Sequence, residues 1–83
     1  MRAKIEQFHS KNQFLIRDEN SVALQSYKSI IAVVDNEGNI TLDKNKWDCS
    51  PTTGKYRNMF LWETKAETLK KINSGEYKLA DLN

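Results

Sequence analysis

The longest apolar run of the chain lies at residues 30–34, where isoleucine, alanine and valine fill odd and even positions alike. A strand that buries only one face alternates apolar and polar residues, so this run predicts a central strand covered on both sides or nearly so. We expect Ile31 and Val33 to be buried in it. The residues before the run keep an extended pattern, which predicts one long extended segment over residues 22–34.

Two shorter apolar segments flank this strand. Residues 14–16 are strand formers, and a polar turn at residues 18–21 follows them. Residues 35–39 combine Asp, Asn and Gly, which tolerate the positive φ of a hairpin loop, and apolar and polar residues then alternate over residues 40–42. The pattern predicts a meander of three antiparallel strands.

The second half of the chain predicts two helices. Ser50 followed by Pro51 is typical of a helix start, because Ser is a good N-cap and Pro needs no N–H at the first helical position. Tyr56 and Phe60 are four residues apart, so they share one side of this helix, which we expect to be buried.

The second helix is expected to begin after Thr64. Thr64 and Glu67 fit the capping box, and Leu69 and Ile72 supply a buried side. The Ser-Gly pair at residues 74–75 is a usual helix end.

These elements predict the α+β class, with a three-stranded antiparallel meander followed by two short helices packed on one face. Residues 1–83 are expected to form a single small domain. In it, residues 1–12 are a terminal arm or short first element, and residues 76–83 are a short last strand or a docked tail.

The charge of the chain is unevenly distributed, with the excess of positive charge in its second half. The net charge is +2, but residues 44–71 hold seven Lys and Arg against three acidic residues, an excess of +4. Such a region fits an acidic partner or a phosphate backbone, and it also fits ordinary solvated helix faces.

The sequence offers little for catalysis. It has one histidine, His9, and one cysteine, Cys49, so a Cys–His pair would need both. No two His or Cys residues have metal-site spacing, and the three glycines are scattered rather than gathered in a phosphate loop. We therefore predict a protein that is not an enzyme, with no catalytic residue, cofactor or metal.

Cysteine content and hydropathy also predict the compartment. A lone cysteine cannot form an internal disulfide, and the first ten residues lack the apolar region of a signal peptide. The run at residues 30–34 is far too short to span a bilayer. These features predict a cytoplasmic protein without a membrane partner.

Two groups of residues are candidates for binding. The first helix start could hold an anion through its N–H groups, the hydroxyls of Ser50, Thr52 and Thr53, and the charge of Lys55. The alternative is a self-contained N-cap, in which the hydroxyls satisfy the backbone.

The other group is a protein-binding face around the first helix, made by Lys55, Arg57 and Trp62. Trp62 follows the last apolar pair of the helix, where a large ring is expected to stay exposed, and Trp beside Arg is a common interface composition. Trp47 and Tyr56 could be a stacking platform for nucleic-acid bases or part of a small core.

One segment also carries a resemblance. It reads Ser26-Tyr27-x-x-Ile30-x-Ala32, then an Asn-x-Gly turn, then Trp47-Asp48-x-Ser50-x-Thr52-Thr53-x-Lys55-Tyr56, and it closes on Phe60-Leu61. In this the chain resembles a group of small uncharacterised bacteriophage and prophage proteins. A tyrosine is usual in that group where this chain has Cys49, which implies that the thiol is not required.

The resemblance implies a context rather than a reaction. Small phage proteins often act by stoichiometric binding that blocks or redirects a host machine, including restriction and CRISPR effectors. It therefore implies a host or phage protein as partner, in the host cytoplasm, and an anti-defence role. The alternative, from the residues, is a small nucleic-acid-binding protein that uses the basic and aromatic region at residues 44–71. The oligomeric state stays open.

Overall fold

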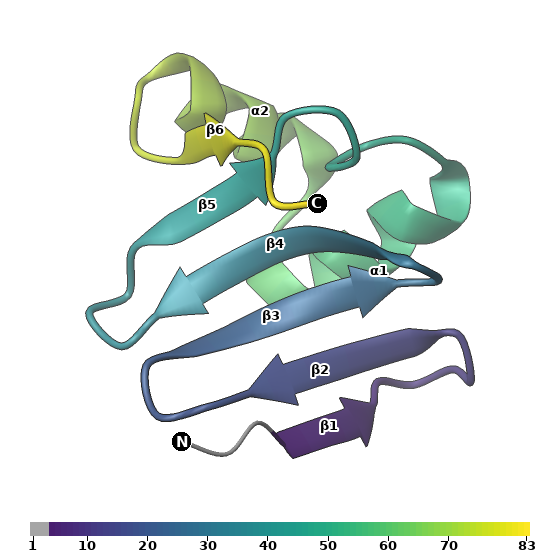
Figure 1. Ribbon diagram of the computed structural model, residues 1–83. Helices are drawn as coiled ribbons and strands as arrows, with labels where there is room; N and C mark the ends of the chain where they lie inside the picture. Colours follow the sequence, from purple (N-terminus) through teal and green to yellow (C-terminus); the bar gives the residue numbers. More distant parts are fainter. Residues whose placement is uncertain (1–3) are drawn as a thin grey trace.

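The computed structural model describes residues 4–83, which form one sheet and two helices (Figure 1). The strands are β1 (Lys4–Gln7), β2 (Gln13–Arg17), β3 (Ser21–Ser26), β4 (Ser29–Asp35), β5 (Ile40–Asp43) and β6 (Lys78–Ala80). The helices are α1 (Pro51–Leu61) and α2 (Lys65–Asn73). The expectation for residues 1–12 lies partly outside the described residues, and its described part forms β1 and the turn after it.

The strands follow one another across the sheet in sequence order. β1 to β5 are antiparallel neighbours, and β6 pairs with β5 in parallel. The α+β class holds, but the prediction of a three-stranded meander is wrong, because the sheet is six-stranded and mixed. The expected strands at residues 14–16 and 40–42 and both helix starts are present.

The expected single segment over residues 22–34 is two strands joined by a tight turn. Ser26 pairs with Ser29 across the turn, and the first turn residue, Tyr27, has a φ of 56°. Positive φ in a two-residue hairpin loop is usually supplied by Gly or Asn. A tyrosine at this place left no turn signal in the sequence.

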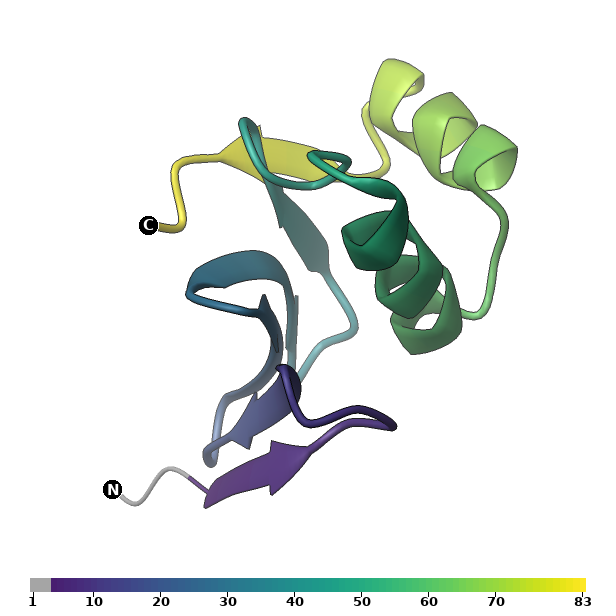
Figure 2. The same ribbon diagram turned by 90° about the vertical axis from the view of Figure 1, so that its right-hand side faces the viewer.

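Both helices lie on the same side of the sheet (Figure 2), with α1 against β3 and β4. The hydrophobic core fills the space between the sheet and the helices. Its buried apolar members are Leu15, Leu24 and Ile31 in one cluster and Ala32, Leu42 and Tyr77 in another. Phe60 of α1 packs against both clusters, as its predicted place on the buried side requires.

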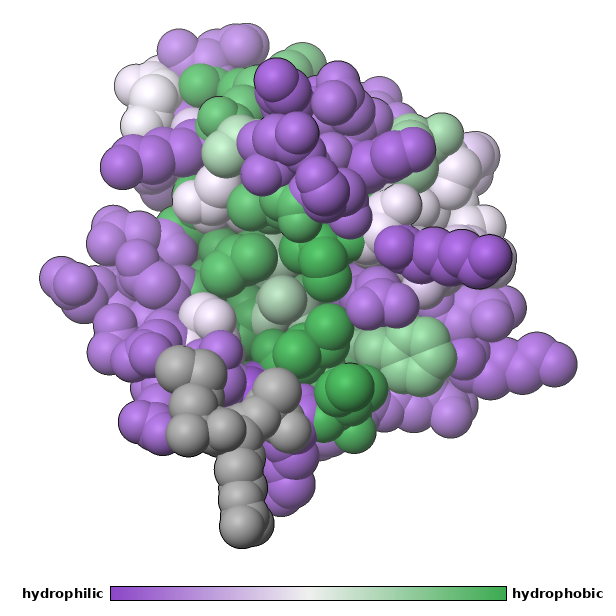
Figure 3. All heavy atoms as spheres, viewed as in Figure 1, coloured by the Kyte–Doolittle hydropathy of each residue, from purple (hydrophilic) through white to green (hydrophobic). Residues whose placement is uncertain are grey.

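The other face of the sheet is open. Leu24 is fully buried toward the helices, so its neighbour Ala23 points the opposite way. The cross-strand partners of Ala23 continue on that face as a row, Ile5–Ile16–Ala23–Val33. Figure 3 shows a continuous apolar area over this side of the sheet.

This open face corrects the interpretation of residues 30–34. Ile31 is buried as predicted, but Val33 is only half-buried, and the strand is not covered on both sides. Apolar residues at alternate positions of β4 face the core on one side of the sheet and form part of an apolar surface on the other.

The C-terminal residues continue beyond β6 as a docked tail. The Asn83 side chain accepts a hydrogen bond from Ile30 N (2.7 Å) and donates one to Ile30 O (3.0 Å). The buried Asp43 carboxylate accepts one from Leu82 N (2.8 Å). Within residues 4–83, neither helix is long and apolar enough to cross a membrane.

Candidate functional site

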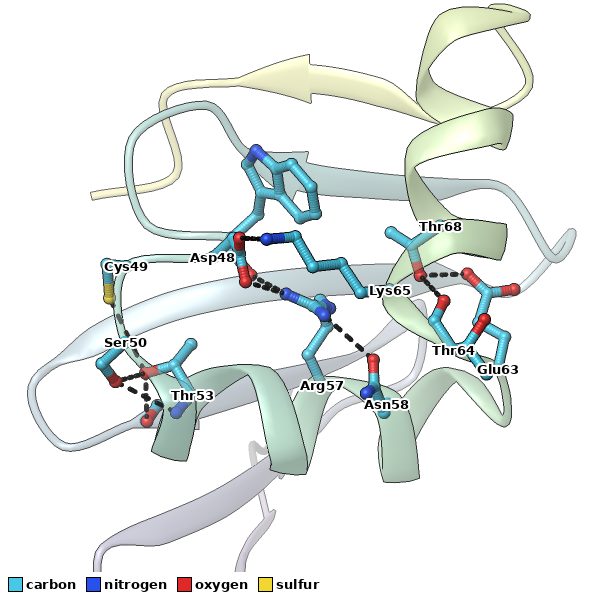
Figure 4. A network of polar contacts seen from close by, with 12 residues as sticks. Asp48, Cys49, Ser50, Thr53, Arg57, Asn58, Glu63, Thr64, Lys65 and Thr68 are labelled. Carbon is cyan, nitrogen blue, oxygen red and sulfur yellow. Dashed lines mark hydrogen bonds and ion pairs between the residues drawn. The ribbon is translucent and has the colours of Figure 1, made fainter.

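The start of α1 is organised by hydroxyl groups that bond to one another (Figure 4). Ser50 is the N-cap, and its Oγ accepts from Thr53 N at 3.1 Å. Thr53 is buried, and its Oγ1 lies 3.1 Å from the hydroxyls of both Ser50 and Ser26 and 3.7 Å from Cys49 Sγ. This network ties the start of the helix to the end of β3.

The four residues expected to hold an anion do not converge on one point. The hydroxyls of Ser50 and Thr53 are used inside the protein, whereas Thr52 and Lys55 are exposed. The geometry therefore favours the self-contained N-cap over the anion site.

Arg57 lies inside the protein rather than on its surface. Its side chain is 1% exposed, and its guanidinium donates to Trp47 O (2.7 Å), Asp48 Oδ1 (3.0 Å) and Asn58 Oδ1 (2.9 Å). It also lies 5.1 Å from the centre of the Trp47 ring. The expectation of an exposed Arg57 on a binding face is wrong, because this side chain fastens the loop after β5 to α1.

Asp48 joins this arginine to α2. Its carboxylate pairs with Arg57 at 3.0 Å and with Lys65 at 2.6 Å (Figure 4). Burial by itself raises the pKa of the Asp48 carboxyl, but the hydrogen bonds and charges of Lys65 and Arg57 outweigh it and hold the pKa below its usual value.

A hollow of about 460 Å³, the α1 cleft, lies beside this ion-pair network. It is lined by Asp48, Cys49, Ser50, Pro51, Gly54, Arg57, Asn58 and Lys65. His9 lines a different hollow, so the structure does not bring the lone histidine and the lone cysteine together in one site. The one carboxylate of the cleft, Asp48, is paired with both of its cations, which suits a structural role better than proton transfer.

A comparable network surrounds Glu63, between the two helices. Its carboxylate is 3% exposed and accepts from Tyr77 Oη (2.8 Å), Lys71 Nζ (2.8 Å) and Thr68 Oγ1 (2.6 Å). Burial opposes the charge, yet these bonds hold the pKa of Glu63 below its usual value, while burial and Glu63 together raise the pKa of Tyr77. Both shifts move the groups away from neutral pH, so the network stabilises the fold.

An exposed apolar surface lies beside the C-terminal end of α1. We call it the Trp62 surface and define it as Trp62, Met59, Phe8 and His9. Trp62 is 93% exposed, as the sequence predicted, and Met59 is 37% exposed. A hollow of about 490 Å³ lies among these four residues and Asn58. Trp62 is also the C-cap of α1, with a φ of 58° and its N–H bonded to Asn58 O, so its backbone is fixed.

Sequence reasoning found Trp62 but missed its neighbours. Phe8 and His9 come from the turn after β1, far away in sequence, and His9 has a φ of 64°. Met59 alone carried a signal, since it precedes Trp62 by three residues and therefore lies one turn away. Trp47 and Tyr56 are half-buried, Trp47 against the second core cluster, so neither is a free stacking platform.

The basic region is less available than its composition suggests. Of its seven cations, Arg57 and Lys65 are paired with Asp48, and Lys71 is paired with Glu63. The remaining four, Lys44, Lys46, Lys55 and Lys70, are exposed. Residues 4–83 contain no group of three or more His, Cys, Asp or Glu placed to hold a metal ion.

The chain belongs to a family of unknown function (DUF8033), which it matches over residues 2–76. No curated protein and no solved structure matches it. The family carries no assigned chemistry, so the geometry of the surface has to support any function.

Proposed function

We propose that this chain is a non-enzymatic, phage-type binding protein that acts in the host cytoplasm. Its target is a host protein, such as a defence or nucleic-acid-processing factor, which it inhibits or redirects by stoichiometric binding. The observation that carries the proposal is the Trp62 surface, where a tryptophan that is 93% exposed stands beside an apolar hollow.

The energetic argument concerns what this ring would gain in a complex. A fully buried Trp removes about 150–250 Å² from water, a gross gain of about 4–6 kcal/mol before ordering costs. The fixed backbone at Trp62 lowers those costs, because little chain has to be immobilised when a partner binds. A large, rigid, exposed aromatic is the usual centre of a protein interface.

The two carboxylates with shifted pKa values near the helices also support a binding role more than an enzymatic one. The carboxylates of Asp48 and Glu63 are paired within the protein, and their pKa shifts favour permanent charge. The resemblance to small phage proteins supplies the anti-defence context. Lys55 stays on the exposed side of α1 and can add charge to the interface, whereas Arg57 cannot.

Nucleic-acid binding is the competing proposal, and the four unpaired lysines of the basic region favour it. Phosphate contacts weaken steeply with salt, while an apolar protein interface changes little. Salt dependence therefore separates the two functions.

The test is affinity capture from bacterial lysate, with and without nuclease, using wild type, Trp62→Ala and the matched control Leu69→Ala. Leu69 is 42% exposed on α2, so its expected place on the buried side of that helix is wrong, and it does not line the hollow of the Trp62 surface. We expect nuclease-resistant capture of a protein that Trp62→Ala weakens by about 30-fold and Leu69→Ala leaves unchanged. Capture of nucleic acid alone, lost in high salt, would reject the proposal.

A further inference from the structure

We propose that β1 is a self-pairing edge, through which two copies of this chain join their sheets in an antiparallel β1–β1 contact about a two-fold axis. In the described part of the chain, β1 has β2 as its one neighbour, and all four of its residues are exposed. An exposed edge strand is a template for another strand unless charge or shape prevents pairing.

The backbone groups available on this edge can be identified. Phe8 N donates to Gln13 O, so the backbone of Phe8 faces β2. Backbone groups alternate along a strand, so those of Lys4 and Glu6 also face β2, while the N–H and C=O of Ile5 and Gln7 face outward. Ile5 therefore presents a donor and an acceptor at the middle of the free edge.

The charges of β1 then favour one register over the others. A two-fold contact centred on Lys4 or on Glu6 would place like charges directly opposite each other, which is unfavourable. A contact centred on Ile5 pairs Ile5 with its own copy through two N–H to O=C bonds. It also places Lys4 opposite Glu6 of the second copy, twice by symmetry. Centring the contact on Gln7, whose backbone also faces outward, places no opposite charges of β1 together, so only the Ile5 centre combines an outward-facing backbone with two favourable charge pairs.

The apolar face continues across the same contact. Ile5 is 67% exposed and ends the row Ile5–Ile16–Ala23–Val33 on the open face of the sheet. Pairing Ile5 with its copy would join the two rows into one and shield both isoleucines from water. A four-residue edge buries less than the roughly 800 Å² per partner of a standard interface, so the dimer is weak and forms at high concentration.

One internal contact has to be controlled. Glu6 already accepts from Arg17 Nε at 2.7 Å, with both side chains about half-exposed. Within a dimer, Glu6 would lie between this arginine and Lys4 of the second copy. Arg17→Gln removes the internal pair and leaves both members of the predicted intermolecular pair in place, so it is the matched control.

The experiment is sedimentation velocity from micromolar to about 1 mM protein, a range that covers weak association. It compares wild type, Lys4→Glu, Glu6→Lys, Arg17→Gln and an equimolar mixture of the two charge reversals. Each reversal alone places two like-charge pairs in the dimer, and we expect a dissociation constant at least about tenfold higher.

The mixture is the decisive sample. In a heterodimer of the two reversals, the introduced glutamate of one chain faces the introduced lysine of the other, and the unchanged Glu6 and Lys4 face each other at the second pair. Both pairs then carry opposite charges, so heterodimers should restore affinity to within about threefold of wild type.

Amide exchange gives a second measurement that does not depend on substitution. The Ile5 amide should exchange more slowly as wild-type concentration rises, because its outward N–H becomes bonded. A wild type that stays monomeric to about 1 mM would overturn the proposal. So would a dimer indifferent to both charge reversals, a mixture that does not recover, or a dimer that Arg17→Gln abolishes.

Discussion

Replacing Arg57 with alanine should strongly destabilise this protein, although an arginine at that position of the sequence suggests a harmless surface change. The substitution deletes three hydrogen bonds, to Trp47 O, Asp48 and Asn58, from a side chain that is 1% exposed. Removing one partner of a buried ion pair costs about 3–5 kcal/mol. Asp48 is 27% exposed and keeps Lys65, so we place the loss at the lower end, about 3 kcal/mol.

Such a loss is a large part of the total stability. A domain of this size has about 4–12 kcal/mol of folding free energy, and each kcal/mol moves the melting temperature by about 4–8 °C. Thermal unfolding followed by circular dichroism should therefore show Arg57→Ala melting about 12–24 °C below wild type. Arg57→Lys keeps the charge but cannot reach all three acceptors, so its melting temperature should lie between those of wild type and Arg57→Ala.

The matched control is Arg17→Ala. Arg17 also forms an ion pair, but it is 47% exposed and its partner Glu6 is 46% exposed, so its removal should cost at most about 1 kcal/mol. If Arg57→Ala melts as close to wild type as Arg17→Ala does, the buried network contributes nothing and our assignment of Arg57 is wrong.

Three further changes test other parts of the fold. Ile31→Asp puts an unpaired charge at a fully buried site and should prevent folding, whereas Val33→Asp on the open face should fold; equal effects by circular dichroism would contradict the two-faced sheet. Cys49 is exposed and makes one weak 3.7 Å contact, so Cys49→Ser should fold and keep partner binding, and loss of binding in a folded variant would show that the thiol matters. The pKa of Glu63 is lowered on folding, so its stabilisation is complete above the unfolded value near 4.5 and is lost as pH falls through the folded value; Glu63→Gln should flatten urea-measured stability over that acid range, and an unchanged slope would refute this.

Local signals predicted the parts of the fold that local chemistry determines. Ser50-Pro51 and the Thr64–Glu67 capping box marked both helix starts, because a cap is a contact within three or four residues. The strand count failed where the cause is not local. Tyr27 adopts a positive φ without a glycine, so the turn that divides residues 22–34 into two strands left no signal. A last strand at residues 76–83 is one of two alternatives that the sequence leaves open, and β6 forms there through its long-range pairing with β5.

In the candidate site, too, the sequence failed to predict features that depend on contacts between distant segments. Helical periodicity could not place Arg57, because two of its three partners, Trp47 and Asp48, come from the loop at residues 44–50, and no pattern within α1 indicates those contacts. A hydrophobic side made of Tyr56 and Phe60 suggested that Arg57 faces water. The structure buries the arginine at the edge of that side, close to the Trp47 ring, where its three hydrogen bonds offset the unfavourable burial of a charge.

Trp62 combines features that folding alone does not explain, and this leads to a final prediction. The residue caps α1 in the left-handed region, which costs an ordinary side chain about 1–2 kcal/mol and is usually occupied by glycine. Its ring is 93% exposed and recovers almost none of that cost within the chain. In denaturant titrations, the free energy of unfolding of Trp62→Gly should therefore equal or exceed that of wild type. It should exceed that of Trp62→Ala by about 1 kcal/mol. Both variants should lose partner binding. A glycine variant less stable than wild type by more than about 1 kcal/mol would mean that the ring supports the fold, and the case for Trp62 as a binding residue would lose its main physical support. If the variant is instead more stable and inactive, the tryptophan is kept at a position where folding favours glycine, and binding is the reason.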